Sequence, residues 1–225
     1  RRVDGVSSGV GIILLNDDND NCIIVDLGAN NKLTAGHLKD LEHVIAEAEV
    51  VIFQLEIPLE TVKYGMELAK KLGKTTIFNP APANPEAIDL LSMATIVNPN
   101  ESELLILNGK SPDKKISESE CVELARNLLA KGPETVIVTR GEKGSIVITE
   151  QDVKKVGTVK VDAVDTTGAG DAFTGSLAVA LAEGKDMLEA VKLASLTGAY
   201  CVTKEEVIPG LPTRNELYEF QRTHT

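Results

Sequence analysis

A glycine-rich loop near residue 170 carries the residues best suited to chemistry. Gly168, Ala169 and Gly170 stand directly before a run of small and apolar residues that predicts a helix. Their backbone N–H groups would gather at the helix N-terminus, where the helix dipole attracts an anion. Asp171 follows at the mouth of this expected anion hole. Because a carboxylate has the wrong charge to cradle a phosphate, its position favours a general base for a hydroxyl that attacks the phosphate.

Two better-known phosphate-binding motifs do not fit this loop. A Walker A loop requires Lys after its second glycine, and Ser176 stands in that place after Gly175. The dinucleotide fingerprint requires a third glycine, and Phe173 occupies its place. The plain alternative is an aspartate in the first turn of a helix, stabilised by the helix dipole beside a glycine-rich turn. The residues in this window leave both roles of Asp171 open.

Three other segments place polar residues at the expected ends of strands or helices. Asn100 and Glu103 have the spacing of a helix capping box. Residues 139–144 follow an expected strand, and their two glycines suit either a β-turn or a close backbone approach to a ligand. Glu56 follows a buried strand at its carboxyl end, where α/β sheets bind ligands. A solvated carboxylate at a strand end explains Glu56 equally well.

Alternating short strands and helices are predicted to position these residues, which indicates a mostly parallel sheet in an α/β fold. A β-hairpin is expected first, from strands at 8–15 and 22–26 around an Asn/Asp cluster at 16–21. The later strands are expected at 50–54, 75–78, 95–97, 135–139, 144–149 and 158–163. The helices are expected near 35–48, 58–72, 85–91, 168–183, 187–202 and 213–222, with helix starts also at the capping patterns Asn100/Glu103, Ser117/Glu120 and Thr213/Glu216.

Composition excludes several classes of protein. The 225 residues are 43% hydrophobic and 25% charged, which is ordinary for a soluble globular chain. The apolar runs fall far short of the ~18 residues that cross a bilayer, so no membrane segment is expected. A net charge of −11 and the lack of Trp argue against nucleic acid as a partner. The three cysteines, Cys22, Cys121 and Cys201, cannot all pair, which favours the reducing cytoplasm.

The stretch from Asp165 to Gly175 closely resembles the C-terminal signature of the ribokinase-like sugar kinases, the phosphofructokinase B family. Further elements of that family are matched in chain order by Gln54-Leu55-Glu56, Asn79-Pro80-Ala81-Pro82-Ala83, Val97-Asn98-Pro99-Asn100-Glu101-Ser102-Glu103 and Thr139-Arg140-Gly141-Glu142-Lys143-Gly144. The resemblance covers essentially the whole chain. It implies a three-layer α/β sandwich with a mostly parallel central sheet, an incomplete β-hairpin lid over residues 1–30, a nucleotide-binding and catalytic core over 31–225, and a homodimer formed through the lid.

The activity implied by the resemblance is ATP-dependent phosphorylation of D-ribose at O5. Asp171 would be the base and contact the sugar, and the amides of Gly168, Ala169 and Gly170 would stabilise charge on the transferring phosphoryl group. Glu56 would form a hydrogen bond to the sugar. The ATP-binding residues would be Asn100, Thr139, Arg140, Gly141, Glu142, Lys143, Gly144, Gly170 and Ser195.

Two metal ions are also implied by the resemblance. Mg²⁺ would be faced by Glu103 through water. An activating K⁺ would lie beside the anion hole, held by Asp165 and Thr167 and by backbone carbonyls of Cys201, Lys204, Glu206 and Gly210. The family commonly has Gly-Ala where this chain has Glu206-Val207, and Ser at Gly210. Because the loss of a glycine can forbid a positive φ, the expected K⁺ site depends on the backbone at Glu206.

Other functions remain open at this stage. The same signature would suit a fructokinase, a deoxyribokinase or a nucleoside kinase. A catalytically incomplete nucleotide-binding fragment is a further alternative, because family members carry roughly 80–90 additional N-terminal residues with an Asn-x-x-Asp and a glycine-rich element that grip the sugar. A G-x-S-x-G pattern at residues 5–9 resembles the nucleophile elbow of hydrolases. That elbow needs a strand before it and a helix after it, and neither is expected here.

Overall fold

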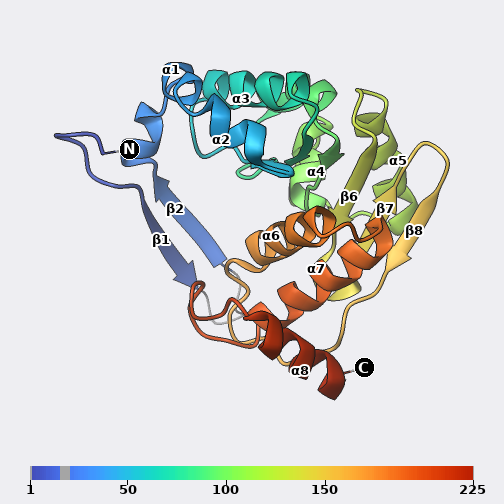
Figure 1. The fold of residues 1–225 in the computed structure, drawn as a ribbon. Helices are drawn as coiled ribbons and strands as arrows, with labels where there is room; N and C mark the ends of the chain where they lie inside the picture. The colour runs from blue at the N-terminus through green and yellow to red at the C-terminus, as the bar shows by residue number, and fades with distance from the viewer. Residues whose placement is uncertain (1, 16–20, 225) are drawn as a thin grey trace.

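The computed structural model describes residues 2–15 and 21–224, and contains one six-stranded sheet and one separate two-stranded sheet (Figure 1). The strands of the larger sheet follow chain order: β3 (Val50–Phe53), β4 (Thr75–Phe78), β5 (Ile96–Val97), β6 (Thr135–Thr139), β7 (Ser145–Ile148) and β8 (Val153–Val156). Strands β3 to β6 are parallel to one another, and β7 and β8 continue antiparallel. The predicted mostly parallel sheet is therefore confirmed.

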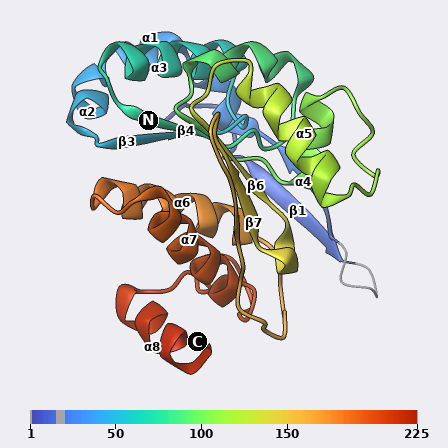
Figure 2. The same cartoon turned by 90° about the vertical axis from the view of Figure 1, so that its right-hand side faces the viewer.

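Helices cover both faces of this sheet, which gives three layers (Figure 2). One face carries α1 (Ala35–Lys39), α2 (Glu42–Glu47), α3 (Leu59–Lys71), a 3-10 helix (Pro85–Met93), α4 (Glu101–Leu107) and α5 (Glu118–Leu129). The other carries α6 (Ala169–Ala182), α7 (Met187–Cys201) and α8 (Arg214–His224).

Side-chain alternation along the strands produces the two cores that hold these layers together. Phe78 packs into the core under α3, α4 and α5, whereas its neighbour Ile77 packs into the core under α6 and α7. Val97 and Ile96 repeat this division on the next strand. Successive side chains of a strand point to opposite faces, so strands buried on both faces must be apolar throughout.

The first two strands form a hairpin that stands apart from the main sheet (Figure 1). β1 (Val10–Leu15) and β2 (Asn21–Asp26) pair antiparallel, with Ile12 opposite Ile24. Directly opposed residues share a face, and Val10, Ile12 and Ile24 are all exposed on it. The Asn/Asp cluster predicted between these strands lies mostly at residues 16–20, outside the described residues.

Three predicted elements differ from the structure. The strand expected at 158–163 is wrong, because the last strand is β8 and residues 157–163 form no strand. β8 is an edge strand with Lys154 and Lys155 exposed, so it lacks the apolar run that marked the other strands. The helix expected at 35–48 is two helices that meet at Leu41, and the one expected at 85–91 is 3-10 instead of α. Among the described residues, no helix is both long and apolar enough to cross a membrane.

Glycine at position 144 is required by the turn between β6 and β7. Gly144 has φ +78° and ψ −135°, a backbone conformation that is essentially restricted to glycine. A Cβ atom there would lie 2.2 Å from the Val156 carbonyl oxygen. Gly141 in the same turn also has a positive φ, +54°, but a Cβ there would meet nothing within 4 Å.

We therefore expect Gly144→Ala to lower the free energy of unfolding well beyond its matched control, Gly141→Ala. The control should cost roughly 1–2 kcal/mol, because it adds only the strain of a left-handed alanine. Gly144→Ala adds the clash with Val156 to a comparable strain. Urea denaturation of both variants measures the difference, and equal losses would contradict this account of the turn.

Candidate active site

The glycine-rich loop turns into α6 at Gly168, which is the N-cap residue of that helix. Gly168 has φ +77°, and a Cβ atom there would lie 2.5 Å from Val207 Cγ1. The loop after α7 therefore packs directly on the start of α6, and only glycine permits both the backbone angle and the contact. The Gly168 carbonyl accepts the Ala172 N–H at 2.8 Å, which closes the first helical turn. The earlier N–H groups of this turn have no helical acceptor, so they can face an anion. Among them, the Ala169 N–H makes only a long hydrogen bond, 3.4 Å, to the Thr166 carbonyl in the loop.

Asp171 lies in the first turn of α6 and remains exposed on its outer side. The protein packed around it raises the pKa of its carboxyl group through partial desolvation. Asp171 also lines a large cavity beside α6. The predicted juxtaposition of an acid with the helix N-terminus is therefore present in the structure.

A second carboxyl group, that of Glu103, belongs to the same electrostatic environment. Burial raises the pKa of Glu103 to about 7, the N–H of Asn100 opposes this rise, and the charge of Asp171 adds to it. Glu103 Oε2 accepts the Asn100 N–H at 2.8 Å and Oε1 accepts Asn100 Nδ2 at 2.9 Å. Asn100 Oδ1 in turn accepts the Glu103 N–H at 2.8 Å. The predicted capping box at the start of α4 is confirmed, and it holds Glu103 near Asp171.

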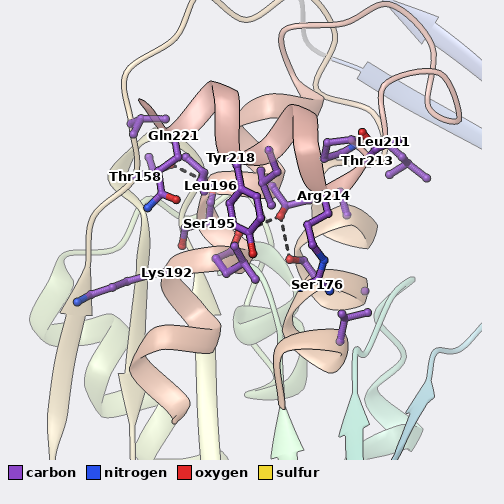
Figure 3. Close-up of a pocket in the computed structure, with 18 of the residues that line it drawn as sticks. Thr158, Ser176, Lys192, Ser195, Leu196, Leu211, Thr213, Arg214, Tyr218 and Gln221 are labelled. Atoms are coloured by element: carbon purple, nitrogen blue, oxygen red, sulfur yellow. Dashed lines mark hydrogen bonds between the residues drawn. The ribbon is translucent and has the colours of Figure 1, made fainter. Parts of the chain in front are cut away.

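The cavity beside α6 has a volume of about 950 Å³ and extends from Asp171 along α7 and α8. Its walls come from α6, α7, α8, residues 157–159 and the segment before α8 (Figure 3). Its apolar lining includes Val159, Val179, Leu193, Leu196, Leu211 and Leu217. A cavity of this size and lining is typical of small-molecule and cofactor sites.

Ser195 is the predicted ATP-binding residue that lines this cavity together with Asp171. It is 7% exposed, and its Oγ is buried with no hydrogen-bond partner among the described residues. Such a group is costly unless something supplies a partner, so it marks a point where a ligand can bind. Figure 3 shows Ser195, Ser176 and Tyr218 among the side chains that line the cavity.

The α8 contribution to the cavity was missed by sequence reasoning. Tyr218 and Arg214 line the cavity from this helix, and Arg214 forms an ion pair with Glu183 at the end of α6. The only sequence signal in this region was the capping pattern of Thr213 and Glu216. That pattern is confirmed, since Glu216 Oε2 accepts the Thr213 N–H at 2.8 Å. The capping pattern predicted where the helix begins, but it did not indicate a ligand-binding role for α8.

Residues 139–144 lie outside the lining of this cavity and are held by their own contacts. The Thr139 N–H donates to the Pro99 carbonyl at 3.0 Å, which joins this turn to the residue before Asn100. The Arg140 side chain is 8% exposed and donates from Nε to Glu101 at 2.8 Å, with Glu118 at 3.7 Å. Its guanidinium is therefore committed to an ion-pair network within the protein.

Glu56, the predicted sugar contact, lies three residues beyond the end of β3 and is exposed. It does not line the cavity of Asp171 and Ser195. Its segment is joined to the β4 side of the sheet, because the Leu55 N–H donates to the Ala81 carbonyl at 2.9 Å. The predicted residues are thus divided between that cavity and the carboxyl ends of β3 to β6.

The residues predicted for a monovalent cation lie near one another beside the loop. Asp165 Oδ1 accepts the Thr167 N–H at 2.9 Å. This hydrogen bond, with smaller contributions from the nearby Thr167 hydroxyl and Glu206 N–H, holds the pKa of Asp165 below its usual value. The Thr167 hydroxyl itself is buried and has no hydrogen-bond partner among the described residues. Lys204 donates its N–H to the Cys201 carbonyl at 3.1 Å.

Glu206 corrects one expectation drawn from the sequence. It adopts φ +65°, the left-handed conformation that the loss of a glycine was expected to forbid. Such a conformation costs a residue with a side chain roughly 1–2 kcal/mol, so the surrounding contacts must hold it. Gly210 permits that packing, since a Cβ there would lie 2.8 Å from the Glu206 carbonyl and 3.5 Å from that of Cys201. Among the described residues, no group of three or more His, Cys, Asp or Glu side chains is placed to hold a metal ion.

A model of the pfkB family of carbohydrate kinases matches residues 1–214. The chain belongs to this family. Its members are phosphotransferases, and the enzymatic class predicted from the glycine-rich loop is therefore confirmed.

Individual family members give a consistent comparison. The ribokinase of Haemophilus influenzae is 36% identical over 213 residues, which are 95% of this chain and 69% of that protein. The deoxyribokinase of Salmonella typhi is 34% identical over 220 residues, which are 97% of this chain and 71% of that protein. The solved structure of Arabidopsis thaliana ribokinase complexed with ribose and ATP is 28% identical, with a TM-score of 0.86 over 96% of this chain and 70% of that one. The chain is thus a ribokinase-like carbohydrate kinase with the expected fold.

The raised pKa of Glu103 predicts a pH dependence of the stability of this pfkB kinase. Since the folded-state pKa of about 7 exceeds the usual 4.5, the folded protein favours the protonated form. The resulting stability is present at low pH and is lost as pH rises from about 4.5 to 7. Glu103→Gln should reduce this loss by about 2 kcal/mol. Glu101→Gln should retain it, because Glu101 pairs with Arg140 and Lys143 and its replacement leaves the Glu103 carboxyl group in place. Urea titrations at pH 5 and pH 8 measure the free energy of unfolding of both variants. If the pH dependence of Glu103→Gln equals that of the unaltered chain, Glu103 is not the group responsible for it.

Proposed function

We propose that the chain transfers the γ-phosphoryl group of ATP to O5 of D-ribose. The observation that carries this proposal is Asp171, which stands beside the open N–H groups of α6 at one end of a 950 Å³ cavity. The ribokinase relatives and the Arabidopsis structure with ribose and ATP support the choice of ribose and of ATP.

In the proposed reaction Asp171 accepts the proton of the sugar hydroxyl as that oxygen attacks the phosphoryl group. Its raised pKa makes it a stronger base than an ordinary aspartate. The N–H groups of Gly168, Ala169 and Gly170 would stabilise the charge on the transferring group, because they are fixed before the reaction and need no reorganisation. The dipole of α6 acts in the same direction.

The cavity offers the nucleotide a polar end and an apolar end. Phosphates would lie toward Asp171 and the first turn of α6, and the adenine would lie between Val179 and Leu196 with Ser195 as a hydrogen-bond partner. Asn100 and residues 139–144 would serve the phosphate side. The amide of Gly141 would serve there, since the Arg140 guanidinium is engaged by Glu101 and the Lys143 N–H donates to the Arg140 carbonyl at 3.1 Å.

Glu103 would face a magnesium ion bound to the nucleotide phosphates. Mg²⁺ commonly takes one or two carboxylates, with phosphate oxygens and water completing the shell, so a cluster of acidic residues is not required. The ion would neutralise charge on the phosphates during transfer. A nearby cation would also favour the ionised form of Glu103, whose protonation burial otherwise promotes.

A potassium ion would lie beside the same loop, held by Asp165 and by backbone carbonyls of Thr167, Cys201, Lys204, Glu206 and Gly210. The fit is supported by the left-handed Glu206, which brings its carbonyl and that of Cys201 close to Gly210. The ion would reinforce the packing of this segment on Gly168.

Residues 1–30 would form a lid over the sugar and a contact with a second copy of the chain, while 31–225 form the core. The exposed Val10, Ile12 and Ile24 supply an apolar face for that contact. A deoxyribose acceptor is the second candidate, favoured by the 34% identity to a deoxyribokinase.

Asp171→Asn should abolish sugar-dependent ADP release while ATP binding persists, because the amide cannot accept the hydroxyl proton. The matched control is Asp186→Asn. Asp186 caps α7 with its Oδ1 2.9 Å from the Glu189 nitrogen, and asparagine caps equally well. A coupled ADP assay with ribose, deoxyribose, fructose and nucleosides identifies the acceptor. Turnover retained in Asp171→Asn would reject Asp171 as the base, and ATP binding without turnover on any acceptor would favour a binding module.

Gly175 provides a test of the nucleotide site that separates stability from binding. It lines the cavity on α6, and a Cβ there would meet nothing within 4 Å. Gly175→Leu should weaken ATP binding at least about tenfold by filling the cavity, yet raise helix stability by up to about 1 kcal/mol. Gly175→Ala should raise helix stability by a similar amount with little loss of ATP binding. Calorimetric titration with ATP measures binding, and urea denaturation measures stability. Unchanged ATP binding in Gly175→Leu would show that the nucleotide does not bind in this part of the cavity.

A further inference from the structure

A line of buried polar side chains joins the sheet to the first turn of α6. Asn79 directly follows β4 and Asn98 directly follows β5, so both stand at carboxyl ends of parallel strands. Asn79 Nδ2 donates to the Asn98 backbone carbonyl at 2.8 Å, and Asn98 Nδ2 donates to the Ile137 carbonyl on β6 at 2.9 Å. Asn98 Oδ1 lies 3.0 Å from the hydroxyl of Thr174 on α6. These hydrogen bonds connect three strands with one helix.

The hydroxyl of Thr174 has two acceptors within reach. It lies 2.9 Å from the Gly170 carbonyl and 3.0 Å from Asn98 Oδ1. The Gly170 carbonyl already has the helical N–H four residues later as its donor, whereas the Asn98 amide oxygen is buried and needs one. The hydroxyl can therefore share its proton between the two acceptors. In this way Thr174 joins the Gly170 carbonyl to Asn98 and restricts the tilt of the Gly170 peptide unit.

The peptide unit beginning with the Gly170 carbonyl ends with the N–H of Asp171. Its orientation therefore sets the direction of one first-turn N–H group and of the Cα that carries the proposed base. Thr174 is 3% exposed, Asn98 2% and Asn79 9%, so water does not compete for these bonds. Buried hydrogen bonds in such surroundings have little freedom to adjust.

We propose that Thr174 and Asn98 are positioning residues of the kinase, which fix the first turn of α6 against the sheet so that Asp171 and the anion-binding amides keep a productive geometry. The proposal rests on the proposed phosphoryl transfer for its kinetic consequence. A displacement of about 1 Å at a reacting group can cost as much as 10²-fold in rate, so a loosened turn would lower kcat more than nucleotide affinity.

The test compares three variants of the full chain. Thr174→Val keeps the shape and removes the hydroxyl, and Thr174→Ser restores it. Thr76→Val is the matched control, because Thr76 is 1% exposed and its hydroxyl joins β4 to Met93 and Thr95 at the opposite end of the sheet. Thr174→Val should lower kcat about 10- to 100-fold with KM for ATP within about threefold of the unaltered chain. Thr174→Ser should recover most of kcat, and Thr76→Val should lose comparable thermal stability with kcat nearly unchanged.

Full kcat in Thr174→Val, or an equal loss of kcat in Thr76→Val, would overturn the proposal. Residue-resolved amide exchange supplies a readout that needs no turnover. Exchange at residues 172–175 should accelerate in Thr174→Val and not in Thr76→Val, and unaltered exchange there would also reject the positioning role. If the unaltered chain transfers phosphate to no sugar, the proposed function fails, and amide exchange alone decides whether the two residues hold the turn.

Discussion

The start of α6 must satisfy two opposing requirements. Its first N–H groups have to stay open, because they bind an anion only while no protein acceptor takes them. The same turn has to be held firmly, although these groups contribute little to its stability: the Ala169 N–H makes only a 3.4 Å hydrogen bond to the Thr166 carbonyl. Contacts from other elements resolve this conflict. Val207 packs on Gly168 from one side, and Phe173 and Leu177 bury the helix against the sheet from another.

The net charge of this protein does not predict whether it binds an anion, because the charges and dipoles close to the site decide binding. A net charge of −11 repels an anion at long range, yet an anion hole built from amides and a helix dipole adds nothing to that sum. The charge of Asp171 adds to the burial that raises the pKa of Glu103, and partial desolvation raises the pKa of Asp171. A site of this kind accepts phosphate most readily with a divalent cation, which offsets both the carboxylates and the ligand.

Local patterns in the sequence predicted the parts of the structure that local chemistry determines. The α6 start, the Asn100/Glu103 box and the Thr213/Glu216 box each depend on residues within one helical turn, and each is present. The missing parts depend on distant partners. The cavity wall from α8 forms only because α8 packs against α7. β8 lies at the edge of the sheet, and its sequence has no apolar run that would predict a strand there. The left-handed Glu206 is supported by a loop whose path a residue pattern does not reveal.

The order of strands in the main sheet is also the order in which the chain is made. Each strand from β4 to β8 pairs with its immediate predecessor, so the sheet can grow by successive short-range additions. The contact between Asn98 and Thr174 is different, since 76 residues separate its partners. Closing so long a loop comes late in folding, because its entropy cost must be met by contacts already made. The anion-binding turn would then be completed after the sheet, which makes binding of a phosphate compound a sensitive report that the whole chain has reached its native state.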